Sequence, residues 1–139
     1  MKHFDISFDF MPTKWIGGWA SVLHFTEGGN CCGYGQRIPG VWVLNKRVHI
    51  VFALNGTGNF EIKTSPLSLN KWYHFRLTQT LQGNKYWYAV YMNNKKIFNK
   101  VNTKPQDFKN VELYIADPWY NAQNGFVKNL KVSGKFRFV

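Results

Sequence analysis

The stretch HFDISFDF, residues 3–10, alternates polar and hydrophobic side chains at every position. Phe4, Ile6, Phe8 and Phe10 fall on one face, and the polar residues between them fall on the other. Successive side chains of a β-strand point to opposite faces, so this period of two predicts a strand with one buried face. Strands of this kind are typical of antiparallel sheets that cover a core on one side only.

The same period recurs at residues 48–54, 73–77 and 111–115. We expect a last strand that places Phe126, Lys128, Leu130 and Val132 on a single face. Turn signals separate these runs, and residues 86–98 indicate a hairpin whose two-residue turn is Asn93-Asn94. No sustained helical stripe with caps is present in the sequence. The pattern therefore predicts an all-β antiparallel β-sandwich, a jelly roll or a related barrel.

The size and composition of the chain suit one domain. Its 139 residues are 45% hydrophobic and 18% aromatic, which is enough for a single core, and no linker or repeat interrupts them. We therefore expect residues 1–139 to form a single domain. No run approaches the roughly 20 apolar residues that span a bilayer, so the sequence predicts no membrane span.

Several segments, in this order, carry a resemblance to a known superfamily. They are HFDISFDFMP, SVLHFT followed by a Gly-rich loop, RVHIVFALNG, PLSLNKWYHFRL, YWYAVYMNNKKIFN and VELYIADPWYNAQNGFVKNLKV. Together they resemble the concanavalin A-like lectin/glucanase superfamily in its laminin G-like branch. The resemblance implies a jelly roll of two antiparallel sheets and a secreted, extracellular protein. It also implies binding of glycans, glycosaminoglycans or proteins, although some members of the superfamily cleave glycans.

Two loops, residues 28–42 and 117–124, combine aromatic, amide and arginine side chains. Aromatic faces stack on pyranose rings and polar groups bond sugar hydroxyls, so this mixture favours a saccharide site. We expect the two loops to meet at one end of the sandwich. The alternative is that their large aromatic residues fill the core. The expected ligand contacts are Tyr34, Trp119 and Tyr120 by stacking, and Asn30, Arg37 and Asn121 by hydrogen bonding.

His74 and Arg76, on one expected strand, form a reserve site on the concave sheet face. His24 and His49 alternate in the same way on other strands, but no short-spacing motif predicts zinc. We expect no metal site and no cofactor; calcium bound by the few oxygen ligands of a loop is the alternative. Glycosidases need two carboxylates close together. None of the 7 Asp and Glu residues has the spacing of the superfamily's hydrolases, so the sequence predicts no enzyme.

Cys31 and Cys32 are the only cysteines and are adjacent. In an oxidising compartment they are expected to form a vicinal disulfide, which is strained because adjacent Cα atoms lie closer than in most disulfides. Two free thiols, or bridges to a second chain in a homo-oligomer, are the alternatives.

The charge is strongly basic, with 18 Lys and Arg against 7 Asp and Glu and a formal net charge of +11. Such a surface attracts polyanions, although a basic solvated surface can also serve solubility alone. No motif indicates specific nucleic-acid binding. The sequence thus predicts a non-catalytic, lectin-like carbohydrate-binding module outside the cell. A polyanion-binding protein, a structural adhesion protein and a polysaccharide-cleaving enzyme are the alternatives. The polyanion site would use residues 95–109, Arg47, Lys128, Lys131, Lys135 and Arg137.

Overall fold

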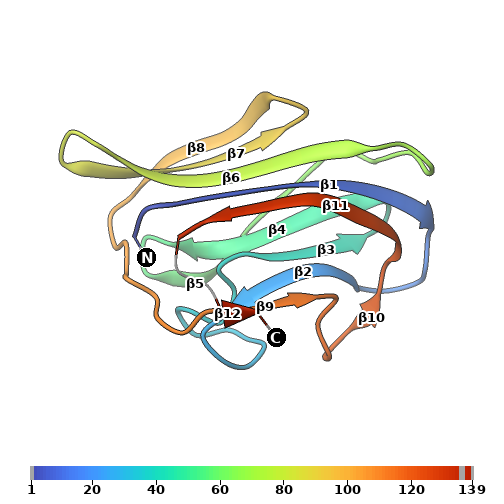
Figure 1. The fold of residues 1–139 in the computed structure, drawn as a ribbon, viewed down its shortest axis with the longest axis horizontal. Coiled ribbons are helices and arrows are strands. Elements are labelled where there is room, and N and C mark those ends of the chain that lie inside the picture. Colours follow the sequence, from blue (N-terminus) through green and yellow to red (C-terminus); the bar gives the residue numbers. More distant parts are fainter. Residues whose placement is uncertain (1, 135–136, 139) are drawn as a thin grey trace.

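The strands of the chain form two sheets that face each other (Figure 1). The buried hydrophobic side chains lie between them. The computed structural model describes residues 2–134 and 137–138. In this part of the chain there are twelve strands and no helix, and hence no helix able to cross a membrane. The prediction of an all-β antiparallel sandwich is therefore confirmed. Lys135 lies outside the described residues, and the side chain of Arg137 is not described.

The first sheet has five antiparallel strands and the second has seven. The five-stranded sheet runs in the order β11 (Asn124–Ser133), β1 (Phe4–Lys14), β6 (Tyr73–Gln82), β7 (Lys85–Met92) and β8 (Lys95–Asn102). The seven-stranded sheet runs in the order β12 (Arg137–Phe138), β9 (Glu112–Ile115), β2 (Ala20–Thr26), β3 (Gly40–Leu44), β4 (Arg47–Leu54) and β5 (Thr57–Lys63), with β10 (Asn121–Ala122) beside β2. Only β12–β9 and β10–β2 are parallel pairs among the described strands.

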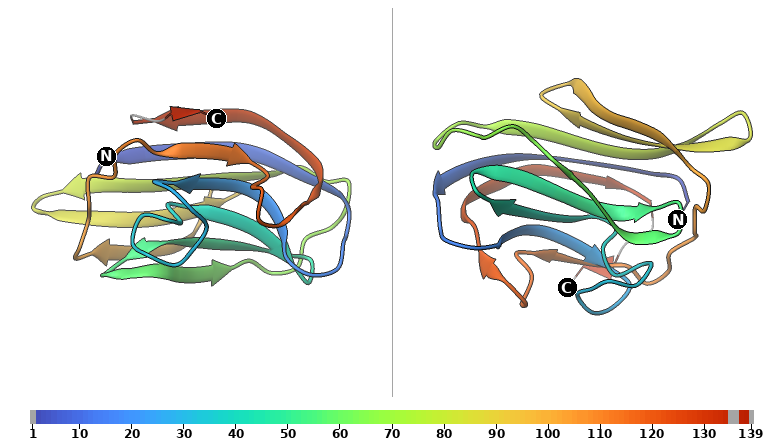
Figure 2. Two further views of the ribbon diagram at one scale, coloured as in Figure 1. Left: turned by 90° about the horizontal axis from the view of Figure 1, so that it is seen from below. Right: turned by 180° about the vertical axis from the view of Figure 1, so that it is seen from behind.

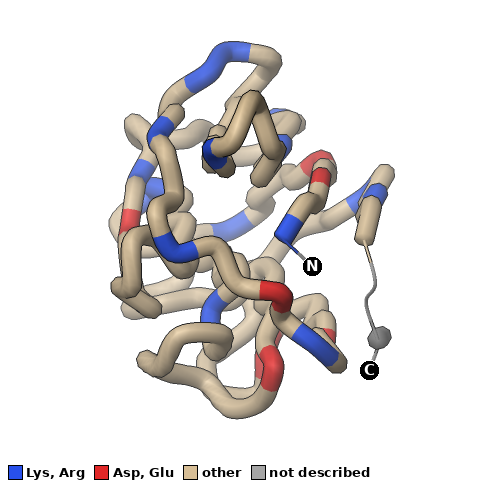
Figure 3. The backbone as a smooth tube through the Cα atoms, turned by 90° about the vertical axis from the view of Figure 1, so that its left-hand side faces the viewer, with Lys and Arg blue, Asp and Glu red and all other residues tan. Residues whose placement is uncertain are grey.

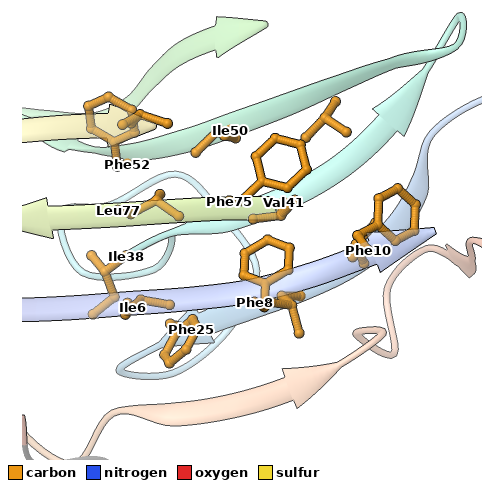
Figure 4. Packing of buried hydrophobic residues seen from close by; sticks show 14 of the residues in the cluster. Ile6, Phe8, Phe10, Phe25, Ile38, Val41, Ile50, Phe52, Phe75 and Leu77 are labelled. Atoms are coloured by element: carbon orange, nitrogen blue, oxygen red, sulfur yellow. The ribbon is translucent and has the colours of Figure 1, made fainter. Parts of the chain in front are cut away.

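The alternation at the start of the chain produces the predicted strand. In β1, Phe4, Ile6, Phe8 and Phe10 are buried, and the residues between them face outward. The side chains of the two sheets meet between the layers (Figure 4). Within the five-stranded sheet, the ring of Phe8 stacks on that of its cross-strand partner Phe75 in β6, with centroids 5.5 Å apart. Burial of large aromatic and aliphatic side chains from both sheets supplies the main stabilising force of the sandwich.

The predicted hairpin is also confirmed. Strands β7 and β8 are joined by Asn93 and Asn94, whose φ angles are 50° and 66°. Two successive residues with positive φ form the type I′ turn, which matches the twist of an antiparallel pair and favours Asn. Asn45 and Lys46 join β3 to β4 in the same way, with φ angles of 52° and 64°.

The prediction for the last strand is wrong in its register. Phe126 is 59% exposed, whereas Val127, Leu130 and Val132 pack against the core. The cause is a β-bulge at Asn129, whose φ is 54°, because Asn129 and Leu130 of β11 together oppose the single residue Phe8 of β1. The bulge turns Lys128 onto the same outer face as Lys131, although strict alternation would separate the two lysines.

Two long connections lie on the outer side of the seven-stranded sheet. One joins β2 to β3 through residues 27–39, and the other follows β9 through residues 116–120. Viewed from below, the first loop crosses the sheet near β2 and β3 (Figure 2). It also reaches β5, where a side chain at Gly58 would overlap the backbone of Cys32 and Gly33. The two predicted binding loops therefore meet on the outer face of this sheet, and not at one end of the sandwich as expected.

Candidate functional site

The two loops are tied together by the buried side chain of His24. This residue is on the outer face of β2, yet its exposed fraction is 0% because both loops cover it. Its Nδ1 lies 3.0 Å from Oδ2 of Asp117, and its Nε2 lies 2.6 Å from the backbone oxygen of Gln36. One imidazole thus holds the loop before β3 and the loop after β9 in a fixed relation.

Both partners of the His24 ring are groups that accept hydrogen bonds, the carboxylate of Asp117 and the backbone carbonyl of Gln36. Burial by itself raises the pKa of Asp117, but the hydrogen bond and charge of His24, with two backbone N–H groups, bring this pKa below its usual value.

Asp117 also shapes the loop that follows it. Its Oδ1 accepts hydrogen bonds from the backbone N–H groups of Trp119 and Tyr120, both at 3.0 Å. Its own N–H donates to Oγ of Ser21 on β2 at 2.9 Å. An aspartate that accepts from residues two and three positions ahead is a common way to fix a tight turn. The turn sets the directions in which the next two aromatic side chains leave the backbone.

Arg37 connects the two loops a second time. Its guanidinium group donates to Oδ1 of Asn30 at 3.2 Å, to Oδ1 of Asn59 at 2.8 Å and to the hydroxyl of Tyr120 at 3.2 Å. The same group lies over the ring of Trp42, 4.5 Å from its centroid. A planar cation with several fixed donors suits this combination of hydrogen bonding and stacking. The result is a cross-linked rim on the outer face of β3 and β5.

An open groove with a volume of about 390 Å³ lies beside this rim, lined by residues 17–19 and 118–121. Two indole rings are at its sides, Trp19 with 38% and Trp119 with 40% of their surfaces exposed. Asn121 lies beside Trp19 because β10 pairs with β2, with Asn121 opposite Ala20. The groove therefore presents two apolar platforms and polar groups at one place.

Two buried polar atoms occur on the same sheet face. Nε1 of Trp42 and Nδ1 of His49, on paired positions of β3 and β4, have no hydrogen-bond partner among the described residues. Oε1 of Glu61 is 3.3 Å from Nδ1 of His49, within ion-pair distance but not in a hydrogen-bonding direction. The ring of Trp19 packs edge-on against His49 at 4.8 Å. Polar atoms without partners thus lie next to one wall of the groove.

The predicted loop residues divide into two groups. Trp119, Tyr120 and Asn121 line the groove, whereas Arg37 holds the hydroxyl of Tyr120 and is itself held by Asn30. These five residues are brought together as the sequence predicts, although whether they contact a ligand stays a prediction. Sequence reasoning missed Trp19 and Asn59. The only local signal for Trp19 is its position directly after Gly17-Gly18. No local sequence signal indicates Asn59.

Tyr34 lies apart from the others. Its hydroxyl donates to the backbone oxygen of Lys104 at 2.6 Å, and its ring packs against Phe108 with centroids 5.8 Å apart. The side chain is half-buried and joins the edge of the hydrophobic core. The alternative given above, an aromatic residue that fills the core, describes Tyr34 better than a stacking platform does. We therefore leave Tyr34 out of the site.

The reserve residues are on the other side of the molecule. His74 and Arg76 lie on the outer face of β6, in the five-stranded sheet, whereas His24 and His49 belong to the seven-stranded sheet. Nδ1 of His74 is 2.6 Å from Oδ1 of Asp9, and Arg76 forms two hydrogen bonds to Asp5, at 3.0 and 2.6 Å. Hydrogen bonds from Asn129 and His74 lower the pKa of Asp9. The predicted pair is thus engaged with carboxylates of β1.

Two further predictions concern the Gly-rich loop and metals. Cys31 and Cys32 are joined as a disulfide between adjacent residues in the structure. Formation of this bond in solution stays a prediction. Among the described residues, no three His, Cys, Asp or Glu side chains gather as a metal site.

Two antiparallel sheets packed in this order form a jelly-roll β-sandwich of the kind seen in galectins. No family model matches the chain, and no curated protein matches it in sequence. Among solved structures, sheep galectin-11 in complex with glycerol is similar, with a TM-score of 0.54 and 15% identity over 96% of this chain and 91% of the galectin.

Two toxin domains are also similar. The receptor-binding domain of botulinum neurotoxin type G has a TM-score of 0.59 and 15% identity. The similar region covers 97% of this chain and 35% of the toxin domain. The binding domain of paraclostridial mosquitocidal protein 1 has a TM-score of 0.56 and 16% identity, with 31% of its length covered by 90% of this chain. The chain thus spans about a third of each toxin domain. Likeness at this identity establishes the fold and not the function.

Proposed function

We propose that residues 1–139 are a single, non-catalytic, lectin-like module that binds carbohydrate outside the cell. The observation that carries the proposal is the groove with two exposed indole rings, Trp19 and Trp119, on its sides and Asn121 at its wall. The same proposal assigns the module to the laminin G-like branch of the concanavalin A-like superfamily. This assignment rests on the sequence resemblance.

The groove chemistry suits a sugar ring. A pyranose presents C–H groups on its faces and hydroxyl groups around its edge, so it needs apolar platforms and a few aligned polar groups. Trp19 and Trp119 supply the platforms. The amide of Asn121 offers a donor and an acceptor, and the hydroxyl of Tyr120, which accepts from Arg37, keeps its own proton to donate.

The rim around the groove is pre-organised. Trp119 and Tyr120 leave a turn fixed by Asp117, and Arg37 holds the hydroxyl of Tyr120. Side chains held before the ligand arrives lose less conformational entropy when they bind it, which raises affinity. The network of His24, Asp117 and Arg37 thus acts as support for the binding residues.

The groove supports binding more than catalysis. Glycoside hydrolysis needs a pair of carboxyl groups beside the scissile bond. The described residues that line the groove, 17–19 and 118–121, include no carboxylate, because the side chain of Asp117 is buried behind them. Solved structures with a similar fold include a galectin in complex with glycerol, a polyol, and two toxin binding domains, which favours a binding role.

A broad glycan array, run with calcium and with a chelator at low and physiological salt, tests the proposed function. We expect selective binding to a small group of neutral glycans, retained at physiological salt and unaffected by the chelator. Signals on every anionic glycan that vanish at physiological salt would contradict the proposal, as would an array with no signal above background. Loss of all signal with the chelator would show that calcium is part of the site.

A further inference from the structure

Three apolar side chains form a row across the outer face of the five-stranded sheet, near one end of it. Phe126 of β11 is 59% exposed and lies opposite Met11 of β1. The preceding residue of β1, Phe10, is buried opposite Tyr73 of β6, so Met11 and Trp72 are one position beyond this pair and both face outward. Trp72 is 38% exposed. Neighbouring strands are about 4.8 Å apart, so the row is roughly 10 Å long.

Lys128 joins this apolar row to a positive charge. It lies on β11 opposite Asp9 of β1, on the outer face, and its Nζ is 3.9 Å from the centroid of the Trp72 ring on the far side of β1. Its aliphatic chain therefore crosses β1 beside Met11. Long basic side chains of this kind cover apolar surface with their stem and keep the charged group in contact with water.

This end of the molecule, on the right in Figure 1, carries basic residues and no acidic ones. The chain segments that meet there are residues 10–19, 64–73 and 118–128. They contain Lys14, Lys71 and Lys128 but no Asp or Glu. The three lysines are exposed and form no ion pair with a carboxylate among the described residues. Figure 3, in which the opposite end faces the viewer, shows Asp and Glu segments among the Lys and Arg segments.

The nearest carboxylate along β1 is already engaged. Asp9 lies 2.6 Å from Nδ1 of His74 and accepts a hydrogen bond from Asn129 at 2.7 Å. It is therefore not available to neutralise the three lysines. The result is an aromatic and apolar row bordered by free ammonium groups, which we call the apolar end.

The chemistry of the apolar end fits the surface of an anionic lipid bilayer. Tryptophan favours the boundary between headgroups and acyl chains, and lysines near a membrane surface are attracted to anionic headgroups. A second copy of this chain fits less well, because two apolar ends in contact would bring the same lysines together with no acidic residue from the three segments to offset them. Charge complementarity thus favours lipid over self-association.

The position of β11 limits how deep this contact can be. Among the described strands β11 pairs only with β1, so it is an edge strand with one row of unpaired backbone groups. Unpaired backbone groups are not tolerated in the hydrocarbon region. Contact with a bilayer is therefore confined to the tips of the side chains, at the depth of the headgroups.

We propose that the apolar end docks the module onto anionic membranes, with Phe126, Met11 and Trp72 at the headgroup boundary and Lys14, Lys71 and Lys128 against the headgroups. This surface goes beyond the proposed function and does not depend on it, because the sugar groove lies on the other sheet. Docking by this end holds the module at a lipid surface whether or not a glycan is bound.

The first test removes the two most exposed rings. Trp72→Ser with Phe126→Ser is compared with Ile97→Ser with Ile115→Ser, a matched control whose side chains are 39% and 61% exposed but lie on β8 and β9. Binding is measured by cosedimentation with vesicles of phosphatidylcholine alone, and of phosphatidylcholine and phosphatidylserine in equal parts. These lipids carry no sugar, so the sugar groove does not contribute to the result.

The second test removes charge and leaves the rings in place. It compares two variants that each lose three exposed lysines. The variant of the apolar end is Lys14→Gln, Lys71→Gln and Lys128→Gln, and the control is Lys85→Gln, Lys100→Gln and Lys104→Gln. Sedimentation velocity without lipid reports the oligomeric state of every variant.

We expect the unmodified chain to bind the mixed vesicles at least tenfold more tightly than phosphatidylcholine alone. Each variant of the apolar end should bind the mixed vesicles about tenfold more weakly than its control, because apolar contacts or headgroup pairing are lost. Absence of binding by the unmodified chain, equal binding to both vesicles, or equal losses in a variant and its control would overturn the proposal. Self-association that Trp72→Ser with Phe126→Ser abolishes would overturn it in favour of a second copy of the chain.

Discussion

His24 and Asp117 form a fully buried pair, with Nδ1 and Oδ2 3.0 Å apart, although 93 positions separate them in sequence. The pair fixes β2 to the loop that presents Trp119 and Tyr120, and Nε2 of the same ring holds the Gly-rich loop through Gln36. A charged pair in the interior is costly unless its remaining hydrogen-bonding positions are satisfied. Here they are satisfied by backbone groups of the two loops, so the position of both loops depends on this buried pair.

The lowered pKa of Asp117 predicts acid sensitivity. A carboxylate whose folded pKa is below its unfolded value of about 3.9 stabilises the fold above that value, and this contribution is lost as the pH falls through the folded pKa. Asp117→Asn keeps acceptors for the two backbone N–H groups but removes the charge. We expect it to lower the free energy of unfolding at pH 7 by about 2 kcal/mol. Urea titrations from pH 7 to pH 3 should also show a smaller decline for this variant, and parallel declines would contradict the assignment.

Arg37→Lys tests the cross-link between the loops. Lysine keeps the charge but cannot reach Asn30, Asn59 and Tyr120 together as the guanidinium group does. We expect faster amide hydrogen exchange in residues 27–37 and several-fold weaker glycan binding, with little change in exchange within the five-stranded sheet. If exchange in this loop is the same as in the unmodified protein, Arg37 does not hold the loop.

Gly40 allows the ring of Trp42 to lie flat on the sheet. A Cβ atom at this position of β3 would overlap the indole ring of Trp42, which packs edge-on against both His24 and Tyr120. Overpacking of this kind costs about 1–3 kcal/mol, so Gly40→Ala should lower the thermal midpoint by several degrees. Gly17→Ala is the control for stability, because no atom lies within 4 Å of its added Cβ. Equal midpoints for the two variants would contradict the packing argument.

Tyr34→Phe separates stability from binding. The change removes the hydrogen bond to the oxygen of Lys104 but keeps the ring against Phe108. We expect a loss of about 1 kcal/mol in the free energy of unfolding and unchanged affinity for glycans. A marked fall in glycan affinity, with stability unchanged, would place Tyr34 in the site after all.

The sequence predicts those parts of the fold that depend on local pattern. The alternation in β1 identifies its buried face, and Asn93-Asn94 identifies a hairpin, because in both cases the determining residues are neighbours. The register of β11 escapes such reasoning. Asn129 adopts a positive φ inside a strand whose hydrophobic residues alternate in the sequence. Only the pairing of β11 with β1 in the structure shows the bulge.

The candidate site also has one part that the sequence predicts and one part that it does not. Composition alone marks the loops that hold Trp119, Tyr120 and Asn121, and the fold brings them to one rim with Arg37. Composition does not distinguish Tyr34, which packs on the core, from Trp119, which lines the groove, since both are aromatic residues in loops rich in small and polar residues. The position of Trp19 beside Asn121 depends on the parallel pairing of β10 with β2, a long-range contact that no local sequence pattern encodes.

The most direct test of the binding groove is a comparison of three tryptophan variants by calorimetric titration with the strongest neutral glycan from the array. Trp19→Ala and Trp119→Ala remove the two groove platforms, and Trp72→Ala removes an indole of similar exposure, 38%, that lies directly before β6 of the other sheet. We predict at least tenfold weaker binding for both groove variants, about 1.4 kcal/mol or more, and a change below twofold for Trp72→Ala. Unchanged affinity in the groove variants, or a loss confined to Trp72→Ala, would contradict the account.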